Sequence, residues 1–389
     1  MIWAFWISFT ILVYVHVGYW AVLHVIPGCR RAPAPGPLPA VTLIVPAHNE
    51  EKCLAAKLRN TLEEIDYPRE LLEIIVASDA STDGTVGIAR SYEARGVRVL
   101  AFDQRRGKTS ALNDAIAAAT HDVLCLCDAN VMFAPQALRF LVAHLNDPAV
   151  GAVTGDVQIA SQDANFGSGE SLYYRIERNI QTHESRTGTT ICVDGGMYVV
   201  RRELYQRLAG DTIIDDFVIS MNVIRQNKSV VYEPRATARE DAVIKARHEF
   251  SRRVRVSAGA AQAIKRGDFP AIWRVATFWK FASHKLLRWT SPAWLVILLV
   301  SNFVLAGRGI VYEMLLGGQA FFYFLALLGG VSVRFRATRF GGVPFYYVMS
   351  HIAMVVGTVK GLLNLQHAAW NRSERSTVEI PLRSTRGAI

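Results

Sequence analysis

Two adjacent carboxylates, Asp215 and Asp216, follow a pair of isoleucines in the second half of this 389-residue chain. Neighbouring negative charges raise the pKa of at least one of the two acids, and an acid with a raised pKa suits the role of general base. Negative charge at the start of a helix is the competing explanation. The pair is therefore a candidate for proton transfer, with both interpretations open from the residues alone.

A second acidic segment, Asp128-Ala-Asn130, follows an apolar run that is typical of a buried strand. Hard divalent cations prefer oxygen ligands. The Asp128 carboxylate, with the Asn130 carbonyl as a weaker ligand, could therefore hold a cation that bridges two phosphates. Asp and Asn are also common in turns for reasons unrelated to metals. Alone, the segment does not distinguish the two explanations.

Two basic segments could meet phosphate groups. Lys108 follows Gly107 at the start of an Ala-rich helical pattern, but Phe102 occupies the position of the first Gly of a P-loop, which excludes that motif. A solvent-exposed lysine is the alternative. Arg252 and Arg255, in the run Arg-Arg-Val-Arg, could clamp a diphosphate or contact anionic lipid.

These residues need a framework, and the apolar pattern predicts one. Short β-branched runs typical of buried strands cover residues 41–46, 72–77, 97–101 and 122–127. They alternate with helical patterns over residues 50–62, 85–94 and 108–119. Such alternation predicts an α/β domain with a parallel sheet and right-handed crossovers.

Ligands of such sheets bind beyond the carboxyl ends of the strands, which gives weight to the polar residues found there. The strand exits carry His48, Asn49 and Glu50, then Ser78 and Asp79, then Asp128 and Asn130. Asp79 could pair with a ring N–H of a nucleotide base, while Thr82 or Asp83 could cap the next helix. Three polar strand exits predict one shared site.

The composition points to a membrane. Hydrophobic residues make up 51% of the chain, the mean hydropathy is +0.19 and the net charge is +10. Residues 1–26 contain no Lys, Arg, Asp or Glu and are long enough to cross a bilayer. Positive charge follows this stretch, at Arg30 and Arg31, rather than preceding it as in a signal peptide. We expect an uncleaved anchor with its N-terminus outside, then a Pro-rich linker over 27–39 and a cytoplasmic domain over 40–267.

The C-terminal part, residues 268–389, is apolar again. Residues 273–289 predict an amphipathic helix at the lipid surface, with its basic residues toward the head groups: Arg274, Lys280, Lys285 and Arg288. Residues 291–306 and 310–330 predict a transmembrane hairpin. Residues 343–365 have arginines on both sides, so we favour a re-entrant or interfacial segment with a cytoplasmic basic tail. A crossing that leaves the tail outside is the alternative.

Taken in order, six segments resemble those of the inverting family 2 glycosyltransferases, especially the membrane-embedded group of cellulose, chitin and hyaluronan synthase-like enzymes. They are Val-Pro-Ala-His-Asn-Glu at 45–50, Ser-Asp-Ala-Ser-Thr-Asp-Gly-Thr at 78–85, Gly-Lys-Thr-Ser-Ala-Leu-Asn at 107–113, Asp-Ala-Asn at 128–130, Asp-Asp at 215–216 and Arg-Arg-Val-Arg at 252–255. The resemblance implies a GT-A-like, mostly parallel sheet flanked by helices, with transmembrane and interfacial helices added.

The resemblance also implies roles for individual residues. Asp216 looks like the catalytic base, beside Asp215 in the place of the family's Glu. Asp128 looks like the first ligand of an Asp-x-Asp motif for Mg²⁺ or Mn²⁺, with Asn130 in the second position. Asp79 would contact the uracil ring. The implied donor-binding set is completed by Pro46, Ala47, Asn49, Glu50, Lys108, Arg252 and Arg255.

Two further positions bear on the acceptor. The family's Gln-x-x-Arg-Trp motif reads Arg252-Arg-Val-Arg-Val256 here, so Val256 replaces the tryptophan that would stack on an acceptor sugar. Transfer of a single sugar to a lipid-linked or other acceptor therefore stands beside polymer synthesis. The segment Trp370–Arg375 resembles a cytoplasmic C-terminal element of hyaluronan synthase-like enzymes.

We therefore expect an inverting glycosyltransferase of the hexosyltransferase type in the plasma (inner) membrane, with several spans. Its expected partners are a nucleotide-diphosphate sugar (first of all a UDP-sugar), a saccharide or lipid-linked acceptor in polysaccharide or glycolipid synthesis, and membrane lipids, with no nucleic acid. A glycoside hydrolase is a weaker alternative, because adjacent carboxylates rarely face each other across a glycosidic bond. The other alternative is a non-catalytic membrane subunit that binds a nucleotide or scaffolds a polysaccharide synthase complex, and it would not need Asp216.

Overall fold

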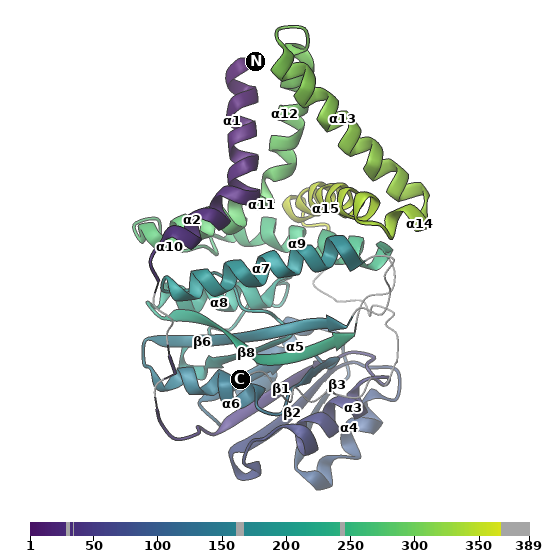
Figure 1. Cartoon of the computed structure of the whole chain (residues 1–389). Helices are drawn as coiled ribbons and strands as arrows, with labels where there is room; N and C mark the ends of the chain where they lie inside the picture. Colours follow the sequence, from purple (N-terminus) through teal and green to yellow (C-terminus); the bar gives the residue numbers. More distant parts are fainter. Residues whose placement is uncertain (29–31, 34, 161–166, 242–245, 367–389) are drawn as a thin grey trace, which may run out of the picture.

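The computed structural model of the chain describes residues 1–28, 32–33, 35–160, 167–241 and 246–366. A mixed α/β domain lies on one side of a group of apolar helices, with two long helices between them (Figure 1). The basic tail and the segment Trp370–Arg375 lie outside the described residues.

One eight-stranded sheet forms the framework, in the order β3-β2-β1-β4-β7-β6-β8-β5. The first half contains the predicted strands, all mutually parallel: β1 (Val41–Ala47), β2 (Leu72–Asp79), β3 (Val97–Phe102) and β4 (Val123–Cys127). The second half is mixed and comprises β5 (Val131–Phe133), β6 (Val150–Ala160), β7 (Met197–Arg201) and β8 (Ser229–Asp241). Here β7 runs antiparallel to both β4 and β6, and β5 runs antiparallel to β8, while β6 and β8 are parallel.

The sheet is covered on both faces, which explains why its first strands are mostly apolar. Along β1, Leu43 and Val45 belong to one core cluster and Ile44 to another. The first cluster includes side chains of α3 (Leu54–Arg59), α4 (Thr85–Arg90) and α6 (Ala137–Ala143). The second includes side chains of α5 (Lys108–Ala118) and α8 (Asp215–Arg225). Each fully buried aliphatic side chain contributes about 1.5–3 kcal/mol.

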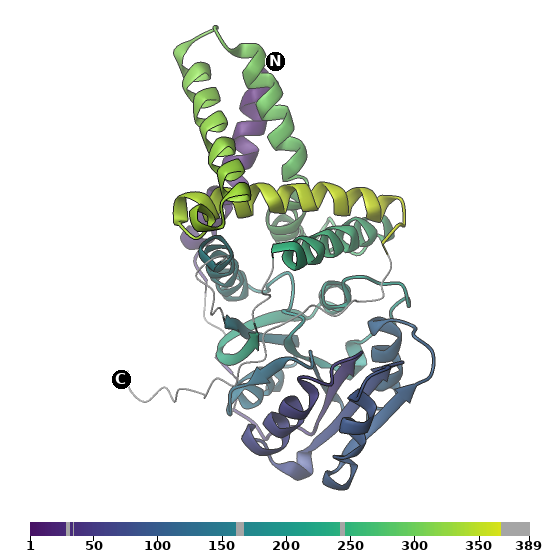
Figure 2. The same ribbon diagram turned by 90° about the vertical axis from the view of Figure 1, so that its right-hand side faces the viewer.

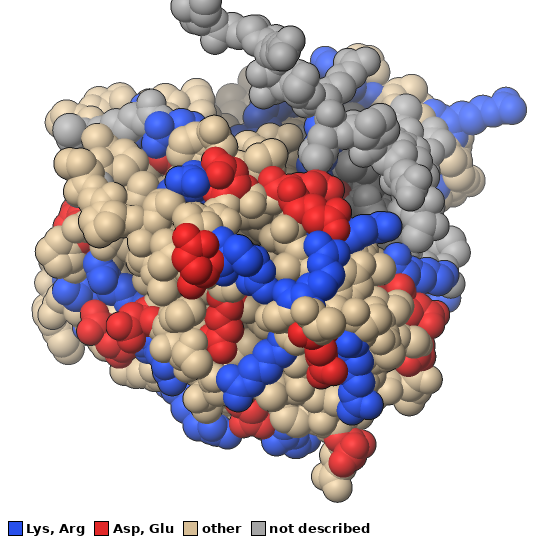
Figure 3. Space-filling model, turned by 90° about the horizontal axis from the view of Figure 1, so that it is seen from below, with Lys and Arg blue, Asp and Glu red and all other residues tan. Residues whose placement is uncertain are grey.

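Two long helices, α7 (Gly167–Arg186) and α9 (Ala246–Arg266), lie between the sheet and the apolar helices (Figure 1). On the opposite, lower face of the domain, Lys, Arg, Asp and Glu are interspersed (Figure 3). Mixed charge of this kind is expected where a surface meets water. The two faces of the domain therefore have different surroundings.

The apolar helices begin with α1 (Ile2–Val13), which continues through a π-helical turn at Tyr14–Gly18 into α2 (Tyr19–Val25). The C-terminal group comprises α12 (Ser291–Leu305), α13 (Ile310–Val331), α14 (Val333–Arg336) and α15 (Arg339–Leu362). Among the described residues, three helices are long and apolar enough to cross a membrane: Ile2–Val25, Ile310–Val331 and Arg339–Leu362. A fourth span is counted if the bent pair Val275–Trp289 and Ser291–Leu305 is one.

Helix α15 lies across the base of the upright apolar helices and along α9 (Figure 2). Its backbone comes very close to α9, because a Cβ atom at Gly357 would collide with the carbonyl oxygen of Val254, and one at Gly361 with that of Ala258. Small residues allow such close helix packing. Whether this segment crosses the bilayer or lies at its surface stays a prediction.

The segment between α9 and α12 forms α10 (Val275–Phe281), a π-helical turn (Ala282–Leu286) and α11 (Leu287–Trp289). We expected its basic side chains to point outward to head groups at the membrane surface, and this was wrong, because they point into the protein. Lys280 Nζ donates to the carbonyl oxygens of Glu184, Thr187 and Thr189 at the end of α7. Arg274 donates to the carbonyl oxygen of Ile224. Lys285 and Arg288 both pair with Glu177. The positive charges therefore lie at the negative ends of α7 and α8 and beside one acid inside the protein.

Candidate active site

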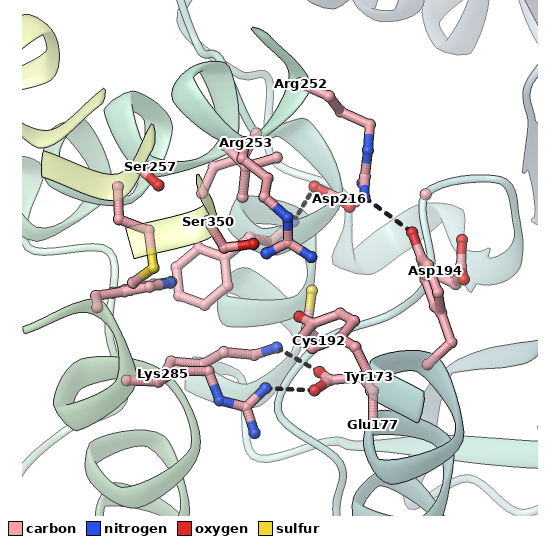
Figure 4. Close-up of a pocket in the computed structure, with 18 of the residues that line it drawn as sticks. Tyr173, Glu177, Cys192, Asp194, Asp216, Arg252, Arg253, Ser257, Lys285 and Ser350 are labelled. Carbon is pink, nitrogen blue, oxygen red and sulfur yellow. Dashed lines mark hydrogen bonds and ion pairs between the residues drawn. The ribbon is translucent and has the colours of Figure 1, made fainter. Parts of the chain in front are cut away.

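A cavity of about 530 Å³ lies between the sheet and the apolar helices. We call it the central cavity. Its sheet end is lined by Lys108, Asp128, Asp194, Asp215, Asp216, Glu240 and Arg255. Its helix end is lined by side chains of the N-terminal π-helical turn (Tyr14–Gly18), α7, α9, α11 and α15. Figure 4 shows Arg253, Asp216 and Lys285 converging on this space.

Lys108 joins two of the acids. It begins α5 directly after Gly107, whose φ of +89° suits glycine. Lys108 Nζ lies 2.9 Å from Asp128 Oδ1 and 3.5 Å from Asp215 Oδ2. Burial opposes the lysine charge, but the neighbouring carboxylates outweigh it and raise the pKa of Lys108 above its ordinary value. A charged lysine therefore stands between the exit of β4 and the start of α8.

Asp216 is the strongest candidate for a base. Burial, with the charge of Asp215, raises the pKa of Asp216 to about 6, although Lys108, the Phe217 N–H and Arg255 each act in the opposite direction. The Phe217 N–H donates to Asp216 Oδ1 at 2.8 Å. An acid with this pKa is largely deprotonated at neutral pH and still basic enough to accept a proton.

A turn that the sequence did not single out, Asp194-Gly195-Gly196, lies against Asp216. A Cβ atom at Gly195 would stand 3.0 Å from Asp216 Oδ2, so glycine allows this close approach. Asp194 Oδ1 accepts the Gly196 N–H at 3.0 Å, and the Asp194 N–H donates to Thr154 Oγ1 at 2.8 Å. Burial raises the pKa of Asp194 to about 7, with contributions from Glu240, Asp216 and Asp128.

The two predicted arginines both line the central cavity. Arg255 Nη1 donates to the carbonyl oxygen of Ile213 at 3.3 Å, just before the acidic pair. Arg252 is held by Glu249, at 2.7 and 2.9 Å, and by the hydroxyl of Tyr174 at 2.9 Å. Arg255 is therefore the arginine beside the acids, and Arg252 points toward α7.

Asp79 lies next to this cluster but does not line the cavity. Its side chain is almost fully buried, and its two oxygens accept the N–H groups of Arg106 and Gly107 at 2.8 Å each. These amides immediately precede Lys108. In the structure Asp79 therefore positions the loop that carries the lysine, and its contact with a uracil ring stays a prediction.

The residues at the end of β1 and just after it lie one loop further from the central cavity than Asp79. Asn49 Oδ1 accepts the Thr82 N–H at 2.8 Å, and the Glu50 N–H donates to Thr85 Oγ1 at 2.7 Å. Pro46 and Ala47 are the last two residues of β1. None of these four residues is among the described residues that line the central cavity. The structure brings Lys108, Asp128, Asp215, Asp216, Arg252 and Arg255 together, and it leaves the 46–50 segment beside the 78–85 loop.

The two predicted metal ligands, Asp128 and Asn130, have different surroundings. Asp128 lines the cavity, whereas Asn130 is buried and donates its Nδ2 to Glu240 Oε1 at 3.1 Å. Within the described part of the chain, no three His, Cys, Asp or Glu residues are grouped to hold a metal by themselves. Mg²⁺ and similar divalent cations need only one or two carboxylates when phosphates and waters complete the coordination. Burial is the main cause of the raised pKa of Asp194, and the charges of Glu240 and Asp128 add to it. A cation that arrives with a diphosphate would offset this negative charge.

The fold is that of GT-A glycosyltransferases. The chain is similar to the solved structure of mannosyltransferase PcManGT from Pyrobaculum calidifontis, described in complex with GDP-Man and Mn²⁺. The TM-score is 0.71 at 24% sequence identity, and the match covers 93% of this chain and 100% of that one. The likeness extends to both the sheet domain and the helices.

The sequence comparisons then give the family. Residues 42–209 match the model of glycosyl transferase family 2, and this part of the chain is a glycosyltransferase domain of that family. The chain is 27% identical over 213 residues to the probable glycosyltransferase YdaM of Bacillus subtilis, a match covering 51% of this chain and 50% of that protein. It is 23% identical over 238 residues to the poly-beta-1,6-N-acetyl-D-glucosamine synthase of Staphylococcus epidermidis, covering 60% and 57%. The match spans about half the length of these relatives.

Proposed function

We propose that the protein transfers a sugar, with inversion at the anomeric carbon, from a nucleotide-diphosphate sugar to a saccharide or lipid-linked acceptor in polysaccharide or glycolipid synthesis. A UDP-sugar is the first donor to test. The observation that carries the proposal is Asp216, which has a pKa near 6 and opens into a cavity that also presents Lys108 and Arg255. A family 2 domain and a polysaccharide synthase among the relatives support it.

In the proposed reaction Asp216 takes the proton of an acceptor hydroxyl while that oxygen attacks the anomeric carbon. The new carbon–oxygen bond forms as the bond to the diphosphate breaks on the opposite face, and the proton remains on Asp216. Lys108 and Arg255 stabilise the negative charge that develops on the departing nucleotide diphosphate. Mg²⁺ or Mn²⁺, held by Asp128, would neutralise part of the same charge. Asp215 keeps the basicity of Asp216 high.

We further propose that residues 1–26 form a membrane anchor, 27–39 a linker and 40–267 a catalytic domain on the cytoplasmic side of the plasma membrane. Residues 268–389 would add the membrane hairpin and the surface helices. The apolar helices and the mixed-charge surface on the opposite face support this arrangement. Membrane lipids are then partners of the chain.

The test is a release assay on the full chain, purified and returned to lipid, with a panel of nucleotide sugars and free nucleoside diphosphate as the readout. We expect turnover with at least one donor, and we expect Asp216→Asn to bind that donor without transferring the sugar. If Asp216→Asn turns over like the unchanged protein, the proposed mechanism is wrong. Donor binding without turnover in every preparation would favour the non-catalytic scaffold instead.

A further inference from the structure

The central cavity continues from the acids to the apolar helices. At its helix end it is lined by Val15 and His16 of the π-helical turn and by Tyr347, His351 and Met354 of α15. Both elements belong to candidate membrane spans. The Tyr347 hydroxyl lies 3.0 Å from His16 Nε2 and joins the two walls. One cavity therefore connects the proposed base with two candidate membrane spans.

Between the two ends lie cations that the proposed donor site does not use. Lys285 and Arg288 share the single carboxylate of Glu177, with Lys285 Nζ at 3.1 Å from Glu177 Oε1 (Figure 4). On α9, Arg253 donates to Glu249 at 2.8 Å and shares that acid with Arg252. His284 lies 2.8 Å from Glu177 and 2.9 Å from Glu184, so Glu184 belongs to the same cluster. Among these described residues four cations, Arg252, Arg253, Lys285 and Arg288, face three carboxylates.

This excess of positive charge is largely buried. The side chains of Arg253, Lys285 and Arg288 are only 14%, 16% and 19% exposed. Burying a cation is costly unless an anion compensates it. One cation at Glu177 would suffice to tie α7 to α11, and Glu249 pairs with two arginines of its own helix. The second cation at each of Glu177 and Glu249 indicates a site for an anionic ligand.

The surroundings also argue against a saccharide chain at this position. Arg253 lies over the rings of Tyr173 and Tyr346, with its guanidinium carbon 4.8 and 4.7 Å from the two ring centres. One face of each ring is therefore covered by a cation and cannot stack on a sugar. Val256, which also lines the cavity, offers no aromatic face. Beyond the cations the lining includes the apolar side chains Val15, Val343 and Met354.

We infer that the acceptor is a lipid whose phosphate-bearing head group binds Arg253, Lys285 and Arg288. Its apolar chain would lie between the π-helical turn Tyr14–Gly18 and α15. The inference rests on the proposed function. It also restricts the head group, because a base is needed only if the attacking atom carries a proton. The head group must therefore present a free hydroxyl beyond its phosphate, as a sugar or polyol joined to the lipid through phosphate does. The hydroxyl proton goes to Asp216 and the oxygen bonds to the anomeric carbon, while the bond from that carbon to the diphosphate breaks and the nucleoside diphosphate leaves. The lipid phosphate is unchanged.

The test is photo-crosslinking of the full chain in lipid nanodiscs, with a diazirine-bearing polyprenyl-diphosphate-linked N-acetylglucosamine as the probe. We expect labelling of peptides from residues 14–18 and from α15. Excess unlabelled probe lipid should prevent it, whereas an alkyl glycoside without phosphate and soluble sugar 1-phosphate should not at equal concentration.

Two variants test the cations. Lys285→Gln combined with Arg288→Gln should lower labelling at subsaturating probe by roughly tenfold or more, because each charge-assisted hydrogen bond contributes strongly to binding. Arg253→Gln, which leaves Glu249 paired with Arg252, should do the same. Lys265→Gln, an exposed lysine at the end of α9, is the matched control and should label like the unchanged protein. Thermal unfolding temperatures identify any variant that has lost its fold.

Labelling that the alkyl glycoside blocks equally well, or that survives both cation variants, overturns the inference. So does protection of the same peptides by a soluble N-acetylglucosamine oligosaccharide in place of the lipid. The crosslinking needs no donor turnover. A protein that labels as expected but releases no nucleoside diphosphate therefore counts against the proposed function and not against the lipid site.

Discussion

The two ends of the central cavity differ in charge and in the elements of the fold that form them. The sheet end gathers carboxylates that follow β4, begin α8 and precede β7, and burial together with the neighbouring acids raises the pKa of Asp194 and Asp216. The helix end gathers Arg253, Lys285 and Arg288, in a cluster where four cations face three acids. An excess of negative charge favours proton acceptance, whereas an excess of positive charge favours binding of an anion. Chemistry and acceptor binding are thus assigned to different layers of the protein.

Removing the proposed base tests the acidic end most severely. Asp216→Asn should lower sugar transfer by about 10²–10⁴-fold, the range expected when a general base is lost, while donor affinity is retained. The measurement is nucleoside diphosphate release together with titration calorimetry of the donor. Asp66→Asn, which breaks only an exposed ion pair with Arg139, is the matched control and should keep full activity.

Removing divalent cations should have the next largest effect. A chelator should lower transfer at least about a hundredfold, because a metal contributes several kcal/mol to stabilising a departing diphosphate. Added Mg²⁺ or Mn²⁺ should restore the rate, and Asp128→Asn should raise the metal concentration needed for restoration. Full activity in excess chelator would remove Asp128 from the proposed metal site.

The close approach of the Asp194-Gly195-Gly196 turn to the base can be tested with one methyl group. Gly195→Ala should displace the Asp216 carboxylate and lower kcat by about ten- to a hundredfold, since small misplacements of a catalytic group are costly. Gly87→Ala is the matched control, because a Cβ atom there meets nothing within 4 Å. Equal activity of both variants would show that the turn tolerates movement.

The smallest effect is a shift in pH dependence. Because Asp216 acts as a base only when deprotonated, kcat/KM should rise with pH through about 6 and then level off. Asp215→Asn removes a charge that raises the pKa of Asp216, so the rising limb should move to lower pH. A limb that stays in place in this variant would assign it to another group, and Asp194, with a pKa near 7, would be the first candidate.

The sequence was most informative about the acidic end. The first four strands could be predicted because β-branched runs buried on both faces leave a clear pattern. The rule for strand exits placed Asp128 at the site, whereas Lys108, Asp215 and Asp216 were expected there from the family resemblance, and the other two strand exits do not line the cavity. Asp194 escaped this rule because it precedes an antiparallel strand, β7, rather than following a parallel one. A Gly-Gly pair after an acid, just before an apolar run, was the available signal.

The cluster of cations at the helix end of the cavity could not be predicted from the spacing of basic residues in the sequence. Lys285 and Arg288 fit an amphipathic surface helix, and only the crossing of this segment over α7 turns them onto Glu177. The mixed half of the sheet was missed for a similar reason, since β5 and β8 pair across more than a hundred residues of chain. Long-range partners of this kind leave no periodic trace in the sequence.

The glycine contacts between α15 and α9 have a practical consequence. Helix α9, which carries the arginines, packs against the candidate membrane span α15, with backbone against backbone at Gly357 and Gly361. A fragment ending at residue 267 would contain the residues of the sheet and the acids but would lack α15, which forms one wall of the central cavity. Assays on such a fragment would therefore measure a protein whose central cavity is incomplete.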